Sequence, residues 1–315
     1  MSDRAVTAFA PATVSNVACG FDVLGFALEA PGDEVTARFG PSGVTIDAIA
    51  GDAGRLPREA TRNTAGVAAQ ALLTALGERR GVVLGITKGL PLASGLGGSA
   101  ASAAAAVVAV DGLLEAHAPL ATLIACAIEG EGLGTRSAHP DNIAPALCGG
   151  FVLVRHPDPP DIVRLPVPVG LMAVVVHPDL EIETAKARAL LGTTVPLADA
   201  IRQWANLGAL VDGLHRADFA LISRALEDSI AEPRRAPLVP GLAAIKQAAV
   251  DAGALGCSLS GSGPSIFALC HGTDVARRVA DVMTREVKAH IGGAPQTYVS
   301  SIAPQGARIV SSCVS

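Results

Sequence analysis

Residues 88–110 of this 315-residue chain read KGLPLASGLGGSAASAAAAVVAV, and this stretch decides how the rest of the sequence is interpreted. The pattern predicts the end of a strand, a turn of small residues, and then a long alanine-rich helix. Glycine in the turn permits the positive φ that other residues adopt only at a cost, so successive N–H groups can point into one concavity. The unpaired N–H groups of the following helix face the same place. The stretch therefore predicts an anion site suited to a phosphate.

Two other interpretations of this stretch are open. The uncharged run at residues 89–110 is about long enough to cross a membrane, although Gly, Ser and Ala dominate it and are a poor composition for a span. A glycine-containing turn before a buried helix, with no ligand at all, has a similar sequence. Neither GxGxxG opening a helix after a first strand nor GxxxxGK[ST] is present, so the spacing is not that of other common nucleotide loops.

The composition bounds the class of protein. With 50% hydrophobic and 17% charged residues, the chain can bury a large core, and its length suits two domains. A net charge of −5 and an aromatic share of 3% argue against a nucleic-acid partner. The six cysteines form no C-x-x-C pair, and the first residues contain no apolar signal segment. We expect a cytoplasmic protein with free thiols, no disulfide framework and no membrane partner.

The first half of the chain reads as alternating strands and helices. We expect strands at residues 5–10, 23–28, 82–87 and 151–154, a hairpin of 34–39 with 44–49, and helices at 63–76 and 120–128. The first strand is expected to stop at Pro11. The Pro- and Asp-rich segment at residues 156–161 is the best linker candidate, and we place the domain boundary between residues 158 and 159.

The second half has a different order of elements, in which helices are followed by paired strands. Strands are expected at residues 163–165, 171–177, 254–259, 266–270 and 296–301, and helices at 195–210, 218–226, 241–252 and 274–289. A second small-residue loop, SLSGSGPS at residues 258–265, lies between two of the strands. This order is compatible with a ferredoxin-like sandwich.

Several polar residues outside the loop are candidates for chemistry, each with a plain alternative. Asn16 and Asp22 flank a turn, and His139, Asp141 and Asn142 precede a short helix; all of these residue types also serve simply to form turns. Residues 129–132, EGEG, end a predicted helix with two acids, where a carboxylate opposes the helix dipole. This local conflict suggests that one of the acids has another role.

Arginine side chains in the second half are candidates for binding a carboxylate. Thr184 and Arg188 are spaced i, i+4 on one helix face, and Arg235 follows in the segment EPRR. Arginine binds a carboxylate through two parallel hydrogen bonds. The alternative for each arginine is a surface ion pair that contributes about 0–1 kcal/mol to stability.

The pattern Pro91-x-x-x-Gly95-Leu96-Gly97-x-Ser99-Ala100-Ala101 resembles the phosphate loop of the GHMP kinases, a family of small-molecule kinases. Four more segments follow the order seen in the homoserine kinases of that family: NVACGFDVLG, HPDNIAPALCGG, EPRRAPLVPG and SGSGPSIFAL. The resemblance covers most of the chain. Gly98 is a departure, because the family usually has a second serine there.

The resemblance implies a fold and a set of site residues. The fold is α+β, with an N-terminal domain like domain 2 of ribosomal protein S5 (residues 1–158), a ferredoxin-like C-terminal domain (159–315), and ATP between them. ATP would be bound by Pro91, Leu92, Ala93, Ser94, Gly95, Leu96, Gly97, Gly98, Ser99, Ala100, Ala101, Ser260, Gly261, Ser262 and Gly263. Ser99 and Glu131 would hold Mg²⁺, and the substrate pocket would comprise Asn16, Asp22, His139, Asn142, Thr184, Arg188 and Arg235.

By resemblance the substrate is L-homoserine, an amino acid with a terminal hydroxyl. Arg188 and Arg235 would bind its carboxylate and Asp22 its ammonium, while Asn142 or His139 orients the hydroxyl. Asn142 and Asp22 are the candidates for the catalytic step, and the γ-phosphate itself is an alternative acceptor for the hydroxyl proton. Other interpretations are a GHMP kinase for mevalonate, a diphosphocytidyl-methylerythritol or a sugar, or a non-catalytic nucleotide-binding relative. A homodimer is left open, since the apolar residues define no single patch.

Overall fold

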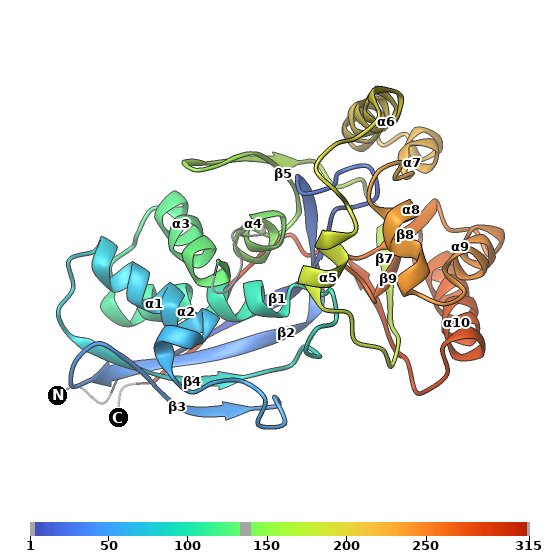
Figure 1. The fold of residues 1–315 in the computed structure, drawn as a ribbon. Helices are drawn as coiled ribbons and strands as arrows, with labels where there is room; N and C mark the ends of the chain where they lie inside the picture. Colours follow the sequence, from blue (N-terminus) through green and yellow to red (C-terminus); the bar gives the residue numbers. More distant parts are fainter. Residues whose placement is uncertain (1–3, 133–139, 314–315) are drawn as a thin grey trace.

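The computed structural model describes residues 4–132 and 140–313, which form two β-sheets with helices packed on them (Figure 1). Seven strands of the described residues build the first sheet, in the order β11-β1-β2-β4-β3, with β5 beside β2 and β6 beside β5. Their bounds are β1 Ala5–Ser15, β2 Leu24–Gly40, β3 Val44–Ala50, β4 Gly81–Thr87, β5 Phe151–Pro157, β6 Pro160–Leu165 and β11 Arg308–Cys313. We call this sheet and its helices the first lobe.

The helices of the first lobe pack against its sheet and against one another. They are η1 Ala60–Arg62, α1 Thr64–Ala75, α2 Gly98–Leu114, α3 Leu120–Glu131 and α4 Pro140–Cys148. The Asn63 side chain caps α1 by accepting from the Ala65 N–H at 3.0 Å. In α2 the alanines are buried in the core, where short methyl side chains let the helix lie close to β1 and β2. The alanine-rich stretch is thus a core helix, and no helix within the described residues is long and apolar enough to cross a membrane.

The second lobe is built on a four-stranded antiparallel sheet of the order β10-β7-β9-β8. Its elements are β7 Leu171–His177, α5 Thr184–Ala189, α6 Leu197–Arg216, α7 Phe219–Ala225, α8 Glu232–Arg235, η2 Ala236–Leu238, α9 Leu242–Asp251, β8 Gly256–Leu259, β9 Ile266–His271, α10 Thr273–His290 and β10 Gln296–Ser301. Alternation in β7 separates two cores: Val174 and Val176 pack with α9 and α10, whereas Ala173 and Val175 belong to the core that includes α6 and α7. The predicted α+β class is confirmed.

The predicted hairpin of residues 34–39 with 44–49 is wrong. The tight turn between β2 and β3 exists, but β4 lies between them, antiparallel to β2 and parallel to β3. Burial gives the reason. Val82, Leu84 and Ile86 of β4 are buried, whereas most of β3 is at least partly exposed. The more apolar strand therefore occupies the interior of the sheet and the more polar strand its edge.

The first two strands are longer than expected. β1 continues through Pro11 to Ser15, and the pairing of β1 with β2 shifts register between Pro11 and Thr13. A proline, which has no N–H to donate to the ladder, is tolerated at such an irregularity. The two predicted strands at residues 23–28 and 34–39 form one continuous strand, β2.

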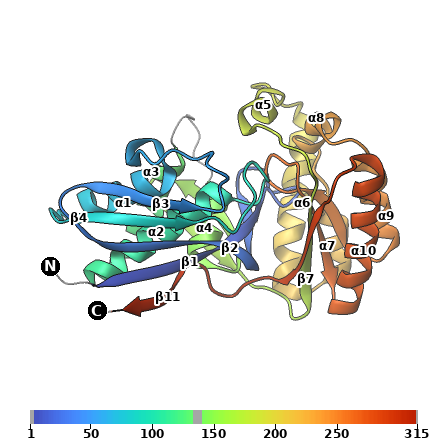
Figure 2. The same ribbon diagram turned by 90° about the horizontal axis from the view of Figure 1, so that it is seen from below.

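The predicted linker at residues 156–161 is instead the end of a hairpin. β5 pairs with β6, and Pro157 faces Pro160 across the turn. The predicted division between residues 158 and 159 falls inside this hairpin, since β6 still belongs to the first sheet. The C-terminal strand β11, which the sequence pattern did not indicate, also pairs with β1 of the first lobe, so that both ends of the described chain lie side by side (Figure 2).

Candidate active site

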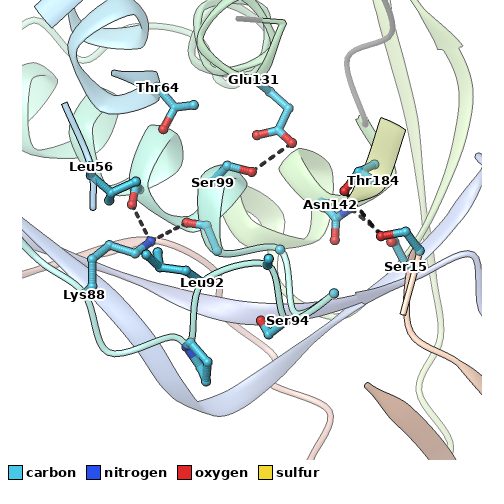
Figure 3. Close-up of a pocket in the computed structure, with 18 of the residues that line it drawn as sticks. Ser15, Leu56, Thr64, Lys88, Leu92, Ser94, Ser99, Glu131, Asn142 and Thr184 are labelled. Atoms are coloured by element: carbon cyan, nitrogen blue, oxygen red, sulfur yellow. Dashed lines mark hydrogen bonds between the residues drawn. The ribbon is translucent and has the colours of Figure 1, made fainter. Parts of the chain in front are cut away.

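A cavity of about 370 Å³ lies between the two lobes, and the phosphate loop forms part of its wall (Figure 3). Both lobes contribute to the lining. Of the predicted site residues, the following line it: Asn16, Asp22, Pro91, Leu92, Ala93, Ser94, Gly95, Gly97, Gly98, Ser99, Glu131, Asn142, Thr184, Arg235, Gly261 and Ser262. Ala100, Ala101 and Leu96 are buried beneath the loop, and Arg188 contacts Asp22 at its edge. His139 lies outside the described residues.

The phosphate loop has the backbone that its glycines predict. Gly97 is the N-cap of α2 with a φ of +67°, and a Cβ at this position would lie 2.0 Å from Thr13 Oγ1. No side chain among the described residues caps this helix. The N–H groups of the first turn therefore have no side-chain acceptor, which is the arrangement that favours a bound anion.

The second small-residue loop, residues 258–265, packs directly on the phosphate loop. Ser260 Oγ donates to the Gly95 carbonyl at 2.7 Å, and the Ser265 N–H donates to the Ser94 carbonyl at 3.2 Å. The Gly261 N–H reaches the carbonyl of Ser15 at the end of β1, at 3.1 Å. Both loops and β1 thus meet at one corner of the cavity, although they are far apart in sequence.

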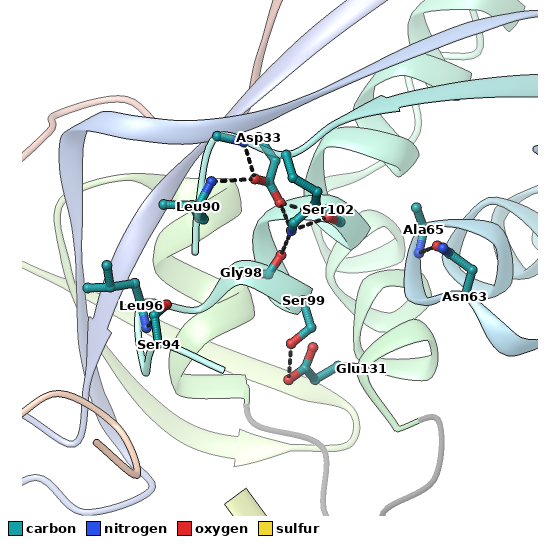
Figure 4. A network of polar contacts seen from close by, with 12 residues as sticks. Asp33, Asn63, Ala65, Leu90, Ser94, Leu96, Gly98, Ser99, Ser102 and Glu131 are labelled. Atoms are coloured by element: carbon teal, nitrogen blue, oxygen red, sulfur yellow. Dashed lines mark hydrogen bonds and ion pairs between the residues drawn. The ribbon is translucent and has the colours of Figure 1, made fainter. Parts of the chain in front are cut away.

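Ser99 and Glu131 face each other at the N-terminus of α2 and the C-terminus of α3 (Figures 3 and 4). Ser99 Oγ donates to Glu131 Oε1 at 3.0 Å, while Oε2 is buried without a hydrogen-bond partner among the described residues. Burial raises the pKa of Glu131 to about 7.

A carboxylate and a hydroxyl are oxygen ligands that suit Mg²⁺, which typically takes one or two protein ligands plus substrate phosphates. Within residues 4–132 and 140–313, no group of three or more His, Cys, Asp or Glu side chains could hold a metal by itself. The donor set at Ser99 and Glu131 therefore fits a magnesium ion shared with a nucleotide.

Two arginines and one aspartate lie around the ring of Phe21. The guanidinium groups of Arg188 and Arg235 each lie 5.3 Å from the ring centroid. Arg188 pairs with Asp22 across the two lobes, with Nη1 2.6 Å from Oδ2. Arg235 is buried, donates to the Gly261 carbonyl at 3.0 Å, and has its pKa lowered by that burial. The structure thus brings together three residues predicted for the amino-acid pocket.

Asn16 and Asn142 are held in place by their neighbours. Asn142 donates from Nδ2 to Ser15 Oγ at 3.0 Å (Figure 3). Its Oδ1 accepts from Thr13 Oγ1 at 2.8 Å. Asn16 has a φ of +69°, accepts from the Asp22 N–H at 3.0 Å, and donates to the Gly261 carbonyl at 2.7 Å. Asn16 therefore stabilises the turn, as the plain alternative predicts, and it also lines the cavity.

Four charged residues that line the cavity lie outside the predicted site set, namely Arg55, Arg62, Lys88 and Asp141, and of these only Asp141 was noted in the sequence. Asp141 lines the cavity and is 1% exposed; its Oδ1 has no partner among the described residues, and burial together with the Asp22 charge raises its pKa to about 7. Lys88 and Asp33 form a buried ion pair beneath the loop. The adjacent Asn142 was a signal for Asp141, but the Lys88–Asp33 pair joins two strands and has no local signature.

The chain matches two family models over parts of its length and homoserine kinases over nearly all of it. Residues 63–150 match the GHMP kinases N terminal domain, and residues 210–289 match the GHMP kinases C terminal model. A homoserine kinase of Chlorobaculum tepidum is 46% identical, covering 98% of this chain and 99% of that relative. The crystal structure of homoserine kinase from Cytophaga hutchinsonii has a TM-score of 0.94 at 48% identity, covering 97% of both chains.

More distant structures share the fold alone. The crystal structure of L. major mevalonate kinase in complex with R-mevalonate has a TM-score of 0.69 at 18% identity, covering 93% of this chain and 95% of that one. The two family models, the full-length relatives and the geometry of the loop agree. The chain belongs to the homoserine kinases of the GHMP kinase family.

Proposed function

We propose that this protein transfers the γ-phosphate of ATP to the side-chain hydroxyl of L-homoserine, giving O-phospho-L-homoserine for threonine biosynthesis. The observation that carries the proposal is the composition of the cavity. The small-residue loop before α2 and a polar wall with the buried Arg235 face one space of about 370 Å³. The full-length identity to homoserine kinases supports the choice of substrate.

ATP would place its phosphates on the loop from Pro91 to Ala101, beneath the loop containing Ser260 and Gly263. Phosphoryl transfer passes through a loose transition state, so the protein contributes mainly position and charge neutralisation. Bound Mg²⁺, held by Ser99 and Glu131, would supply neutralising charge at the phosphates. The buried Oε2 of Glu131 supports this role, because it has no hydrogen-bond partner among residues 4–132 and 140–313 and a cation would satisfy it.

L-Homoserine would bind with its carboxylate at Arg235 and Arg188 and its ammonium at Asp22, with Thr184 and Asn16 completing the wall. Asn142, held by Thr13 and Ser15, would orient the hydroxyl toward the γ-phosphate. Both oxygens of the Asp22 carboxylate lie within hydrogen-bond distance of Arg188 Nη1, and a carboxylate engaged by Arg188 and by the substrate ammonium is not free to accept the hydroxyl proton. We therefore infer that Asp22 orients the substrate and that the phosphate receives the hydroxyl proton.

The remaining expectations stay predictions. Free thiols at all six cysteines are compatible with a reducing compartment, and we propose a cytoplasmic location on that ground. A homodimer also stays a prediction. A sugar or mevalonate kinase would have no ammonium to bind and no use for the second arginine, which disfavours those substrates.

A coupled ADP-release assay tests the proposal with L-homoserine, L-serine, L-threonine and mevalonate side by side. We expect turnover with L-homoserine to exceed that with each of the other three by at least about a hundredfold, because a misplaced hydroxyl loses its alignment with the γ-phosphate. Preferred turnover of mevalonate would reassign the substrate. ATP binding without turnover of any of the four would instead indicate a non-catalytic relative.

A further inference from the structure

The Lys88 side chain lies beneath the phosphate loop, where it forms part of the cavity wall but is almost fully buried. It is 2% exposed, and its ammonium group donates to the Gly98 carbonyl at 2.7 Å, to Ser102 Oγ at 2.8 Å, and to Asp33 Oδ2 (Figure 4). An ammonium group has three N–H donors. All three are therefore directed at acceptors within the protein.

Asp33, in β2, connects both ends of the loop. Its Oδ1 accepts from the N–H groups of Gly89, at 3.0 Å, and Leu90, at 3.2 Å, where the chain leaves β4. Its Oδ2 accepts from Ser102 Oγ at 2.7 Å, in the first turns of α2. A single carboxylate thus sets the separation between the beginning of the loop and the helix that follows it.

A contribution to folding stability does not by itself explain the buried Lys88–Asp33 ion pair. A buried ion pair is costly to desolvate and can often be replaced by apolar residues without loss of stability. A cation beside a helix N-terminus is also disfavoured by the helix dipole. Lys88 nevertheless donates to Gly98, the first residue of α2. The charge of Lys88 is unfavourable beside the N-terminus of α2. A role in positioning the loop explains why a lysine nevertheless lies there.

We propose that Lys88 and Asp33 are positioning residues for ATP: they hold Gly98 and the start of α2 at the separation from Gly89 and Leu90 at which the loop binds phosphate. Lys88 acts through the Gly98 carbonyl and does not bind the phosphates itself. This inference rests on the proposed function, because it assigns the loop to ATP. It differs from the P-loop arrangement, in which the lysine reaches the phosphates directly.

The Asp33→Asn variant separates positioning from direct binding. If Lys88 bound phosphate, removing the Asp33 charge would release the ammonium toward the nucleotide, and the KM for ATP would stay the same or fall. If the pair positions the loop, we expect Asp33→Asn to raise the KM for ATP by about tenfold or more, which is about 1.4 kcal/mol. The KM for L-homoserine should stay within about twofold, because its site is elsewhere in the cavity. An unchanged or lower KM for ATP overturns the proposal.

An ion pair at the other end of α2 provides a matched control. Arg4 contacts Glu115, the C-cap residue of α2, far from the loop. Arg4→Met should alter thermal stability with a KM for ATP within about twofold of the parent value, since the contact lies outside the cavity. A comparable rise of the KM for ATP in Arg4→Met would show a general effect of destabilising the helix and count against a specific positioning role.

A measurement without nucleotide keeps the proposal testable if Asp33→Asn does not fold. The double variant Lys88→Met with Asp33→Asn leaves no unpaired buried charge and nearly conserves volume. We expect hydrogen exchange of its ATP-free form to speed up in peptides covering residues 89–102, while peptides of the second lobe keep their protection. Unchanged protection at residues 89–102 overturns the proposal. This result does not depend on catalysis, so it is distinguishable from a failure of the proposed reaction, which would appear as inactive parent protein.

Discussion

Arg188 of α5 forms an ion pair with Asp22, in the turn after β1, with Nη1 2.8 Å from Oδ1 and 2.6 Å from Oδ2. The contact joins the two lobes at the edge of the cavity. The side chains are 40% and 33% exposed, so the pair contributes little to stability. A pair of this kind can exchange partners when a charged ligand enters. Arg188 is thus available to a substrate carboxylate, and the buried Arg235 lines the cavity itself.

Replacing Arg235 by leucine should weaken binding of the amino acid selectively. Loss of a charge-assisted contact to the substrate carboxylate predicts a rise in the KM for L-homoserine of roughly 10- to 100-fold, with the KM for ATP nearly unchanged. Steady-state kinetics with each substrate varied in turn measures both constants. Arg234→Leu is the control, because Arg234 contacts the Leu191 carbonyl and does not line the cavity. An equal loss for both substrates in Arg235→Leu would remove the residue from the amino-acid pocket.

Replacing Glu131 by glutamine should change the response to magnesium. The amide keeps the shape of the side chain but lacks the charge that holds a divalent cation, so we expect kcat to fall by about tenfold or more and the Mg²⁺ requirement to rise. Titration of activity with Mg²⁺ at saturating ATP measures the effect. Glu129→Gln, on an exposed residue of the same helix, should leave the titration unchanged. A Glu131→Gln enzyme with the parental magnesium curve would exclude this residue as a metal ligand.

Replacing Gly97 by alanine should abolish ATP binding through a steric conflict. The new Cβ would lie 2.0 Å from Thr13 Oγ1, so either the loop or β1 must move. Gly192→Ala is a matched control, since its φ is +68° and nothing lies within 4 Å of the added Cβ. Both variants have the same backbone strain, but only Gly97→Ala has the clash. Calorimetric titration with ATP measures the difference, and similar affinities for the two variants would show that the loop tolerates the displacement.

Replacing Asp141 by asparagine should change how stability depends on pH. Burial and the Asp22 charge raise the pKa of Asp141 from 3.8 to about 7 in the folded protein. Between these values the folded state retains a proton that the unfolded state has lost, so this residue makes stability fall as pH rises from about 4 to 7. Asp141→Asn should remove this contribution to the pH dependence of the free energy of unfolding, which is at most about 1.4 kcal/mol per pH unit.

Urea unfolding of the parent and Asp141→Asn proteins at pH 5, 6, 7 and 8 measures this difference. Asp52→Asn is the control, because backbone N–H groups lower the pKa of Asp52 and the residue is ionised in both states over this range. Parallel pH profiles for the parent and Asp141→Asn would show that Asp141 is already ionised in the folded protein.

Local patterns predicted much of the fold and of the nucleotide site. The glycine turn and the alanine run specified the phosphate loop and α2, because positive φ and helix periodicity are properties of neighbouring residues. The same holds for most strands and helices of the second lobe. The five ordered motifs then pointed to the family, which the comparisons confirmed.

Tertiary structure decided what depends on residues far apart in the chain. Insertion of β4 between β2 and β3 follows from which strand best buries its apolar face. The return of β11 to β1 is a long-range pairing of an exposed strand, which its local sequence does not indicate. The Lys88–Asp33 pair joins residues 55 positions apart, and the Asp22–Arg188 pair joins residues 166 positions apart. The sequence by itself determined the small-residue loop before α2 and the identity of the polar groups. Only folding determined which charges face each other, because a carboxylate becomes paired, free or buried through neighbours that its local sequence does not contain.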